Sequence, residues 1–316
     1  METIEKIKVC LLTGFLGAGK TTLLNKVLKK VGTKNTSVIE NEIGFVNIDS
    51  KLITASFKDL FTVSDGCICC SSHHEFENIL IQIIQNETII HSLFIETTGV
   101  ADVNPIIQLF NRKDVQQKFE FIQSICVIDA TQYFSNIQSH PIFKKQMIAS
   151  DTIVVNRTEN IEKNLLNKQL DEIKIINPFA IVFQENELPR DYAPLLEKRT
   201  ITKKPFFYRT LDTTTQEINS ILFETNHSID LTELNFILTR TLTVYGDQIF
   251  RIKGFINDLE NNTYIIQSTG KSIDYKLHTE KINTSQLVFI GKKIEQKAID
   301  RIMKPALIMN QHNILL

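Results

Sequence analysis

Two short stretches of the sequence carry residue types whose spacing points to chemistry. The first, GFLGAGKTT at residues 14–22, satisfies the pattern G-x-x-x-x-G-K-[ST] of a phosphate-binding loop. The second, GCICC at residues 66–70, places three of the chain's five cysteines within four consecutive positions. Cysteine thiolates bind soft and borderline metal ions. The two stretches therefore predict a protein that holds an oligophosphate and a transition metal.

The phosphate-binding stretch lies between an apolar run and an amphipathic segment of helical spacing, which is the setting the motif requires. Its glycines let backbone N–H groups wrap the phosphates, and the N-terminus of the following helix adds a partial positive charge. Lys20 is expected to reach the β and γ phosphates, and the Thr21 hydroxyl is expected to bind Mg²⁺. The predicted nucleotide-binding residues of this stretch are Gly14, Gly17, Ala18, Gly19, Lys20, Thr21 and Thr22.

A carboxylate and a glycine follow a later apolar run, in SLFIETTG at residues 92–99. Glu96 is predicted to hold the hydration shell of Mg²⁺, and the N–H of Gly99 is predicted to sense the γ-phosphate. The predicted catalytic residues are thus Lys20, Thr21 and Glu96, of which the last two bind Mg²⁺.

A different segment, TIVVNRTE, is the candidate for recognising the nucleotide base. It ends another apolar run with Asn156, Arg157, Thr158 and Glu159. This is a variant of the guanine-binding element N-K-x-D. A carboxylate at the last position accepts hydrogen bonds from guanine N1–H and the exocyclic amine, which adenine does not offer in that arrangement. Glu159 supplies the oxygens on a side chain one methylene longer, and Arg157 replaces the lysine. The sequence favours GTP and leaves ATP as the alternative.

Cys67, Cys69 and Cys70 stand just before a segment of helical spacing. The partial positive charge of a helix N-terminus lowers the pKa of a thiol, so that thiolates form readily there. Three sulfurs leave one position of a tetrahedral Zn²⁺ ion to a carboxylate, a histidine or water. Glu40 and Glu42 follow another strand and are expected along the same edge of the sheet, where they are candidates for that position.

Other interpretations of the cysteines stay open. Cys67 and Cys70 form C-x-x-C, which is also the spacing of a redox-active pair. A structural zinc site normally takes a closed set of four ligands, and the chain has no second cysteine cluster. His73 and His74 are expected to be solvated side chains rather than ligands. An open, exchangeable site fits the pattern best, with Co²⁺ or Ni²⁺ as alternatives to Zn²⁺.

The elements that must position these residues follow a regular alternation up to about residue 190, where short β-branched runs alternate with segments of helical spacing. Several runs are apolar at nearly every position, as strands covered on both faces must be. The alternation predicts an α/β fold of the P-loop NTPase type with a mainly parallel, doubly wound sheet. Cys10 and Cys126 lie inside two of these runs and are interpreted as small core residues. The predicted strands are residues 7–14, 36–41, 60–66, 89–96, 123–130, 151–156 and 179–184.

The pattern changes after a polar, basic stretch at residues 197–205, which is the predicted linker. Beyond it, one helical segment at residues 230–246 is followed by strands that succeed one another without helices between them, which implies antiparallel pairing. The predicted domains are a P-loop GTPase domain at residues 1–200, which carries the C-x-C-C motif, and a smaller C-terminal α+β domain at residues 205–316.

Bulk composition restricts the partners. The 316 residues include 35 basic and 36 acidic side chains, so the net charge of −1 offers no broad field for a polyanion, and no nucleic-acid partner is expected. The N-terminus lacks the pattern of a signal peptide, and no apolar stretch approaches the about 18 residues that a membrane span needs. We therefore expect a cytoplasmic protein with no membrane partner. In that reducing compartment, clustered cysteines indicate metal or redox chemistry rather than a structural disulfide.

Four segments follow one another in an order typical of a known family: LLTGFLGAGKTTLL, VIENEIGFVNID, GCICC and IETTGVADVNPII. In these segments the sequence resembles the CobW-type GTPases, metallochaperones related to the urease and hydrogenase nickel-insertion GTPases, and it looks most similar to their YjiA branch. The likeness continues into IFRIKGF and LVFIG and so covers nearly the whole chain. NRTE departs from the family's usual NKxD, and the histidine-rich storage run of some relatives is missing.

The resemblance implies a slow GTPase that uses GTP, GDP and Mg²⁺ and passes a transition metal, zinc in the first place, to a client metalloprotein. It implies that Cys67, Cys69 and Cys70 bind the metal, with Glu40 or Glu42 as partner. Two other hypotheses stay open at this point: a non-catalytic metal sensor or buffer with nucleotide as a structural ligand, and a P-loop kinase of small molecules. The identity of the client and association into a homo-oligomer are also left open.

Overall fold

The structure, a computed structural model, describes residues 5–32, 35–41, 60–63, 73–85, 90–198, 218–246, 248–269 and 271–308. The chain divides into two compact units, residues 1–174 with 180–200 and residues 175–179 with 201–316.

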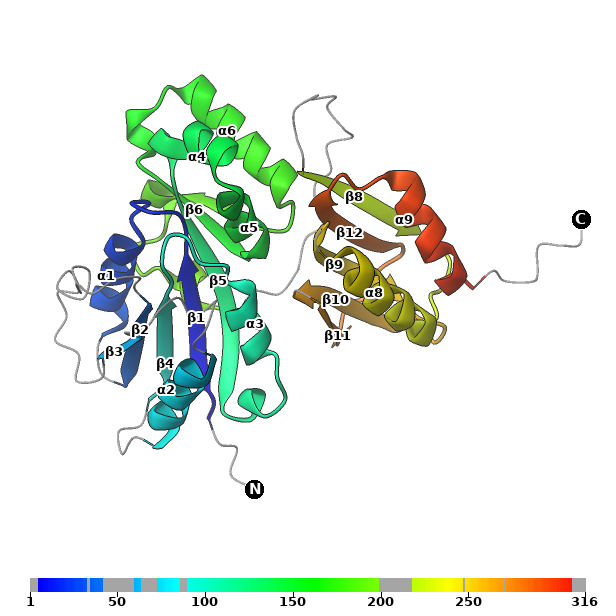
Figure 1. Ribbon diagram of the computed structural model, residues 1–316, viewed down its shortest axis with the longest axis horizontal. Coiled ribbons are helices and arrows are strands. Elements are labelled where there is room, and N and C mark those ends of the chain that lie inside the picture. The colour runs from blue at the N-terminus through cyan, green and yellow to red at the C-terminus, as the bar shows by residue number, and fades with distance from the viewer. Residues whose placement is uncertain are drawn as a thin grey trace, which may run out of the picture. The chain divides into compact units, whose positions relative to one another are not determined.

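Within the described ranges, the first unit is built on a seven-stranded sheet in which every pair of neighbours is parallel (Figure 1). The strand order is β3-β2-β4-β1-β5-β6-β7, so β1 lies between β4 and β5. Loops that leave the carboxyl ends of these central strands gather at one edge of the sheet, which is where ligands bind in folds of this class. The strands are β1 (Ile7–Thr13), β2 (Thr36–Asn41), β3 (Leu60–Val63), β4 (Ser92–Glu96), β5 (Phe119–Asp129), β6 (Thr152–Asn156) and β7 (Ile181–Gln184).

Helices cover both faces of this sheet. Side chains on β1 alternate between two cores: Val9 and Leu11 pack in a core that contains residues of α2 and α3, whereas Cys10 and Leu12 pack with residues of α1. This arrangement confirms the predicted doubly wound α/β fold. The helices of the unit are α1 (Lys20–Val31), α2 (His73–Gln85), α3 (Asn104–Phe110), α4 (Tyr133–Ser139), α5 (Pro141–Ala149), α6 (Lys163–Ile176) and α7 (Ala193–Leu196), with the 3₁₀ turns η1 (Val115–Gln117), η2 (Ala130–Gln132), η3 (Thr158–Asn160) and η4 (Glu185–Glu187).

All seven predicted strands of the first unit are present, and one of them is longer than predicted. β5 begins at Phe119 rather than at residue 123. Residues 119–122 were left out of the prediction, which began with the polar pair Gln123 and Ser124, because these two residues interrupt the apolar pattern; both side chains are nevertheless fully buried. Gln123 Nε2 donates to the carbonyl oxygens of Pro194 at 2.9 Å and Glu197 at 3.1 Å. These hydrogen bonds offset the free-energy cost of burying the amide in the core.

The second unit contains, in its described part, a five-stranded antiparallel sheet of order β11-β10-β9-β12-β8. One face packs against α8, whose Leu234, Leu238 and Leu242 are fully buried at helical spacing. Asp230 begins that helix by accepting hydrogen bonds from the N–H groups of Thr232 and Glu233. The predicted α+β arrangement is thus confirmed. The elements are β8 (Ile218–Thr225), α8 (Leu231–Tyr245), β9 (Ile249–Asn257), β10 (Thr263–Thr269), β11 (Ser272–His278), β12 (Ser285–Lys292), α9 (Gln296–Met303) and η5 (Lys304–Ala306).

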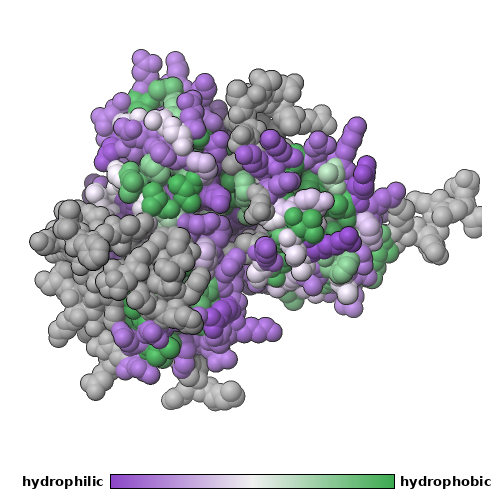
Figure 2. Space-filling view, in the orientation of Figure 1, coloured by the Kyte–Doolittle hydropathy of each residue, from purple (hydrophilic) through white to green (hydrophobic). Residues whose placement is uncertain are grey.

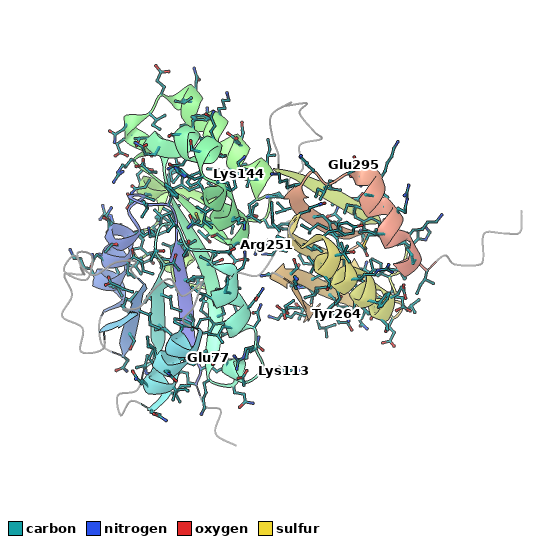
Figure 3. All side chains as sticks on the ribbon, in the orientation of Figure 1. Glu77, Lys113, Lys144, Arg251, Tyr264 and Glu295 are labelled. Carbon is teal, nitrogen blue, oxygen red and sulfur yellow. The ribbon has the colours of Figure 1, made fainter. Side chains whose placement is uncertain are left out.

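The described surface mixes hydrophilic areas with smaller apolar patches (Figure 2). Among the residues labelled in Figure 3, Lys113 and Glu295 are exposed, whereas Arg251 of β9 is only 4% exposed. Among the described helices, none has the length and apolar character needed to cross a membrane.

Candidate nucleotide and metal site

The phosphate-binding loop joins β1 to α1 at the carboxyl end of a central strand. Gly14, Gly17 and Gly19 have φ angles of 137°, 72° and 97°, in the region that favours glycine. A Cβ on Gly14 would lie 2.2 Å from the carbonyl oxygen of Val127 on β5, so this glycine also permits close packing of the loop on the sheet. α1 begins at Lys20 without a side-chain cap, and its first N–H groups therefore suit an anion.

The Lys20 side chain lies within the loop. Its ammonium group donates to the carbonyl oxygen of Phe15 at 3.3 Å, and the residue is only 9% exposed. A cation held at the start of a helix, in a loop with uncapped N–H groups, is the arrangement that binds phosphate oxygens by charge-assisted hydrogen bonds.

Thr21 and Glu96 meet at the end of the loop, although 75 positions separate them in the chain. Thr21 Oγ1 donates to Glu96 Oε1 at 2.6 Å. Both residues are predicted Mg²⁺ ligands, and hydroxyl and carboxylate oxygens are the hard donors that this ion prefers. Their contact gives the residues present a donor set that fits Mg²⁺.

Glu40 lies beside this pair. It is in register with Glu96 on the neighbouring strand, where Glu40 of β2 and Glu96 of β4 are 3% and 7% exposed. Residues in register on adjacent parallel strands project to the same face of a sheet. A predicted ligand of the transition metal therefore neighbours a predicted ligand of Mg²⁺, on the strand edge that both sites were expected to share.

The remaining predicted ligands of the transition metal, Cys67, Cys69, Cys70 and Glu42, lie outside the described residues. β3 ends at Val63 before them, and α2 begins at His73 after them, so the helix predicted to follow the cysteines is present. In the part of the chain that the structure describes, there is no cluster of three or more histidine, cysteine, aspartate or glutamate side chains suited to a metal. The transition-metal site accordingly stays a prediction.

The segment that follows Glu96 lies directly against the phosphate-binding loop. The N–H of Thr97 donates to the carbonyl oxygen of Leu12 at 3.0 Å. A Cβ on Gly99 would lie 2.4 Å from the backbone nitrogen of Leu16. Only glycine permits this approach, which brings the predicted γ-phosphate sensor against the loop that is predicted to hold the phosphates.

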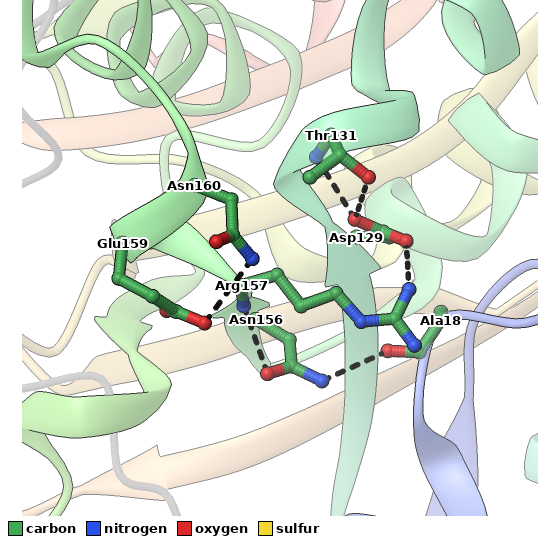
Figure 4. A network of polar contacts seen from close by, with 7 residues as sticks. All are labelled: Ala18, Asp129, Thr131, Asn156, Arg157, Glu159 and Asn160. Atoms are coloured by element: carbon green, nitrogen blue, oxygen red, sulfur yellow. Dashed lines mark hydrogen bonds and ion pairs between the residues drawn. The ribbon is translucent and has the colours of Figure 1, made fainter.

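The predicted base-binding segment is tied to the phosphate-binding loop by Asn156, which donates from Nδ2 to the carbonyl oxygen of Ala18 at 3.3 Å (Figure 4). The Arg157 backbone has a left-handed φ of 57°, and its N–H donates to Asn156 Oδ1 at 2.8 Å. The Arg157 guanidinium forms an ion pair with Asp129, the last residue of β5. Asp129 in turn accepts from the backbone N–H and the hydroxyl of Thr131 at 2.9 and 2.6 Å.

Asp129 was missed by the sequence analysis, although a signal was present. Like Glu96, it is a carboxylate that ends an apolar strand on the edge where ligands gather. Its buried carboxylate fixes the guanidinium of Arg157, a side chain that is 45% exposed. Glu159 is exposed, and in the described structure its carboxylate accepts from Asn160 Nδ2 at 3.3 Å. The ion pair with Asp129 thus restrains the Arg157 side chain, while Glu159 lies at the surface and is accessible to a nucleotide base.

Cys10 and Cys126 are buried, as predicted, and burial raises the pKa of each thiol to about 12. The charges of Lys8 and Lys20 oppose this rise at Cys10 and Cys126, respectively, without cancelling it. Because the thiolate is the reactive form and its population is negligible four pH units below such a pKa, both thiols should be inert at about pH 8.

We expect a disulfide reagent at about pH 8 to modify at most three of the five cysteines in the native apoprotein and all five after denaturation. The count is obtained from the absorbance of the released thiol. Rapid modification of four or five thiols in the folded protein would contradict the burial of Cys10 and Cys126.

Comparison with known proteins now places the chain among relatives. Residues 8–184 match the family described as "CobW/HypB/UreG, nucleotide-binding domain", and residues 218–307 match the "Cobalamin synthesis protein cobW C-terminal domain". The chain is 31% identical to the zinc chaperone YjiA of Escherichia coli, across 94% of this chain and 97% of the relative. It is 26% identical to the zinc chaperone CobW of Pseudomonas aeruginosa, across 97% and 93% of the two chains.

A solved structure shares the fold. The crystal structure of the Zn(II)-bound YjiA GTPase from E. coli superposes with a TM-score of 0.72 at 23% sequence identity, and the match covers 96% of this chain and 99% of that one. The likeness therefore includes both the parallel sheet and the C-terminal antiparallel sheet.

Proposed function

The chain belongs to the CobW/HypB/UreG family, and from that premise we propose that it is a GTPase that binds zinc and transfers it to a client metalloprotein. Two relatives that match almost end to end are named zinc chaperones, and one of them is also named a GTPase. The single observation in the chain's own structure that best supports the proposal is the contact between Thr21 and Glu96 at 2.6 Å, with Glu40 in register beside it.

In this proposal GTP is hydrolysed at the phosphate-binding loop, with Glu96 and Gly99 contributing from the segment after β4. The N–H groups of residues 14–22 cradle the phosphates, Lys20 binds the β and γ phosphates, and Gly99 donates its N–H to the γ-phosphate. Thr21 and Glu96 hold Mg²⁺, whose charge, when the ion is bound, offsets the charge that develops on the transferred phosphoryl group. The turnover is slow, with metal or client as the stimulus.

Recognition of the base falls to Asn156, Arg157 and Glu159. The Glu159 carboxylate accepts from guanine N1–H and the exocyclic amine, and the aliphatic stem of Arg157 covers one face of the base. The ion pair of Arg157 with Asp129 supports this role, because it restricts a long side chain to one position. GTP is the nucleotide that this arrangement favours.

The metal is the cargo. Cys67, Cys69 and Cys70 supply thiolates, and Glu40 or Glu42 supplies a fourth ligand, for Zn²⁺ in preference to Co²⁺ or Ni²⁺. The position of Glu40 next to Glu96 supports a coupling between the two sites. In this proposal residues 1–200 form the GTPase domain, residues 205–316 form the CobW-type C-terminal domain, and the protein works in the cytoplasm on a client metalloprotein.

Zinc affinity should depend on the nucleotide. We expect the dissociation constant for Zn²⁺ to differ by about tenfold or more between the complexes with Mg²⁺ and a non-hydrolysable GTP analogue, with GDP, and with no nucleotide. The constants come from competition with a chromophoric chelator. Because coupling of binding is reciprocal, Zn²⁺ must change the affinity for the analogue by the same factor.

Thr21→Ala provides the matched control for this measurement. It removes one proposed Mg²⁺ ligand and leaves the thiols in place, so zinc should still bind while its dependence on nucleotide becomes much weaker. Equal zinc affinity in all three nucleotide states of the unmodified protein would refute the coupling.

A further inference from the structure

Gly99 is held from two sides. On one side the loop after β4 packs on Leu16 of the phosphate-binding loop through Gly99, and the N–H of Thr97 donates to the carbonyl oxygen of Leu12 on β1, just before that loop. On the other side the contact comes from α5, a helix that is distant in sequence and on which Lys144 is labelled in Figure 3.

The contact from α5 is made by Gln146, whose side chain is fully buried. Its Nε2 donates to the carbonyl oxygens of Gly99 at 3.2 Å and Ala101 at 3.1 Å. Carbonyl oxygens only accept hydrogen bonds, so the two contacts assign the amide nitrogen to this side. Both carbonyl oxygens are buried away from water, so each would lose this hydrogen bond if the Gln146 amide were removed.

The same helix also contacts the phosphate-binding loop. Phe143, three positions before Gln146 and therefore on the same face of α5, meets the ring of Phe15 edge to face at 6.2 Å between centroids. His140, the residue that precedes α5, stacks on the same Phe15 ring with centroids 4.5 Å apart. A single helix thus contacts both the loop predicted to hold the phosphates and the loop predicted to sense the last of them.

We propose that Gln146 is a positioning residue for recognition of the γ-phosphate. Its two hydrogen bonds fix the turn at residues 99–101 against the phosphate-binding loop, so that the N–H of Gly99 is already placed where the γ-phosphate of GTP arrives. Gln146 acts through Gly99 rather than on the nucleotide. The inference rests on the proposed GTPase function. It adds a prediction that the function alone does not make: loss of Gln146 lowers the affinity for GTP and leaves the affinity for GDP nearly unchanged.

Gln146→Met tests this, because methionine keeps the length and approximate volume of the side chain and removes both donors. We expect the affinity for a non-hydrolysable GTP analogue with Mg²⁺ to fall by roughly tenfold, as for loss of a charge-assisted hydrogen bond, while the affinity for GDP stays within about twofold. Titration with fluorescent analogues of both nucleotides gives the ratio. Hydrogen exchange of the peptide that covers residues 97–101 should become faster in the same variant.

Gln123→Met is the matched control. Gln123 is also fully buried and also donates from Nε2 to two backbone carbonyl oxygens, those of Pro194 and Glu197. Its variant also leaves the Thr152 hydroxyl without its acceptor, so it should lower the thermal midpoint at least as much as Gln146→Met does, and it should leave the ratio of the two nucleotide affinities unchanged. A purely structural role for Gln146 would make the two variants behave alike.

The outcomes separate the inference from the function on which it rests. If the unmodified protein binds neither nucleotide, the proposed function fails. If it binds both and Gln146→Met lowers both affinities equally, or neither, the inference alone is overturned. Should Gln146→Met not fold, Gln146→Leu serves the same test, since leucine is uncharged, smaller and also has no donor.

Discussion

Lys20→Ala will lower the affinity for GTP and for GDP by about a hundredfold or more, because it removes a largely buried cation that is proposed to form charge-assisted hydrogen bonds to the phosphate oxygens. The apoprotein should stay folded. In the structure, the ammonium group donates to the carbonyl oxygen of Phe15 at 3.3 Å, which is a long hydrogen bond to an uncharged acceptor. Fluorescent nucleotide titration and thermal denaturation measure the two quantities independently.

Lys30→Ala is the control for charge on the same helix. Lys30 is exposed in the last turn of α1, at the opposite end from Lys20. Its replacement makes the same change in net charge and should leave both nucleotide affinities within about twofold, since an exposed charge at that distance is largely screened. Nucleotide affinity that is unchanged in Lys20→Ala would contradict the phosphate-binding role of the loop.

The fold was largely predictable because buried parallel strands must be apolar along most of their length. The runs around Cys10, Ile95 and Val154 are of this kind, and each is a central strand with neighbours on both sides. The start of β5 was not predictable in the same way. The prediction began at Gln123, and residues 119–122 were left out because the polar pair Gln123 and Ser124 separates them from the apolar run that follows. Only the carbonyl groups that meet Gln123 in three dimensions explain how its amide is accommodated in the core.

The candidate site was predictable where backbone geometry dictates residue type. Gly14 and Gly19 are required by positive φ and close packing, and such requirements leave a motif in the sequence. Gln146 left no motif, and Asp129 left only a general signal, a carboxylate at the end of an apolar strand. Each acts on a segment far away in the chain, Arg157 in one case and Gly99 in the other, and the pairing depends on the register of strands and the placement of helices. Sequence periodicity does not encode those distances.

Strand register also explains how one edge of the sheet can serve two metals. β4 lies between β1 and β2, so Glu96 is in register with Leu12 on one side and with Glu40 on the other. Leu12 leads into the phosphate-binding loop within two residues, and Glu40 leads toward Glu42 and the segment before the cysteines. The proposed Mg²⁺ ligand Glu96 is therefore the strand neighbour of Glu40, a proposed zinc ligand, and the proposed coupling would pass between these two side chains.

Simultaneous replacement of Cys67, Cys69 and Cys70 by serine will lower the affinity for Zn²⁺ by about a thousandfold or more, because a neutral hydroxyl is a poor substitute for a thiolate at a borderline metal ion. GTP and GDP should bind as they do to the unmodified protein, since none of the three side chains belongs to the proposed phosphate or base contacts. Competition titration against a chromophoric chelator gives the zinc affinity. The dependence of nucleotide affinity on Zn²⁺ should disappear together with zinc binding.

The matched control is the double variant Cys10→Ala, Cys126→Ala, which removes the two buried thiols and should leave zinc affinity within about twofold.

Glu40→Gln and Glu42→Gln, made separately, then identify the carboxylate that completes the zinc site. The variant that removes this ligand should lose about tenfold or more in zinc affinity. Zinc affinity that survives in the triple serine variant would place the cargo elsewhere. It would also remove the reason for coupling through Glu40 and Glu96, because that route starts from a metal held by these thiolates.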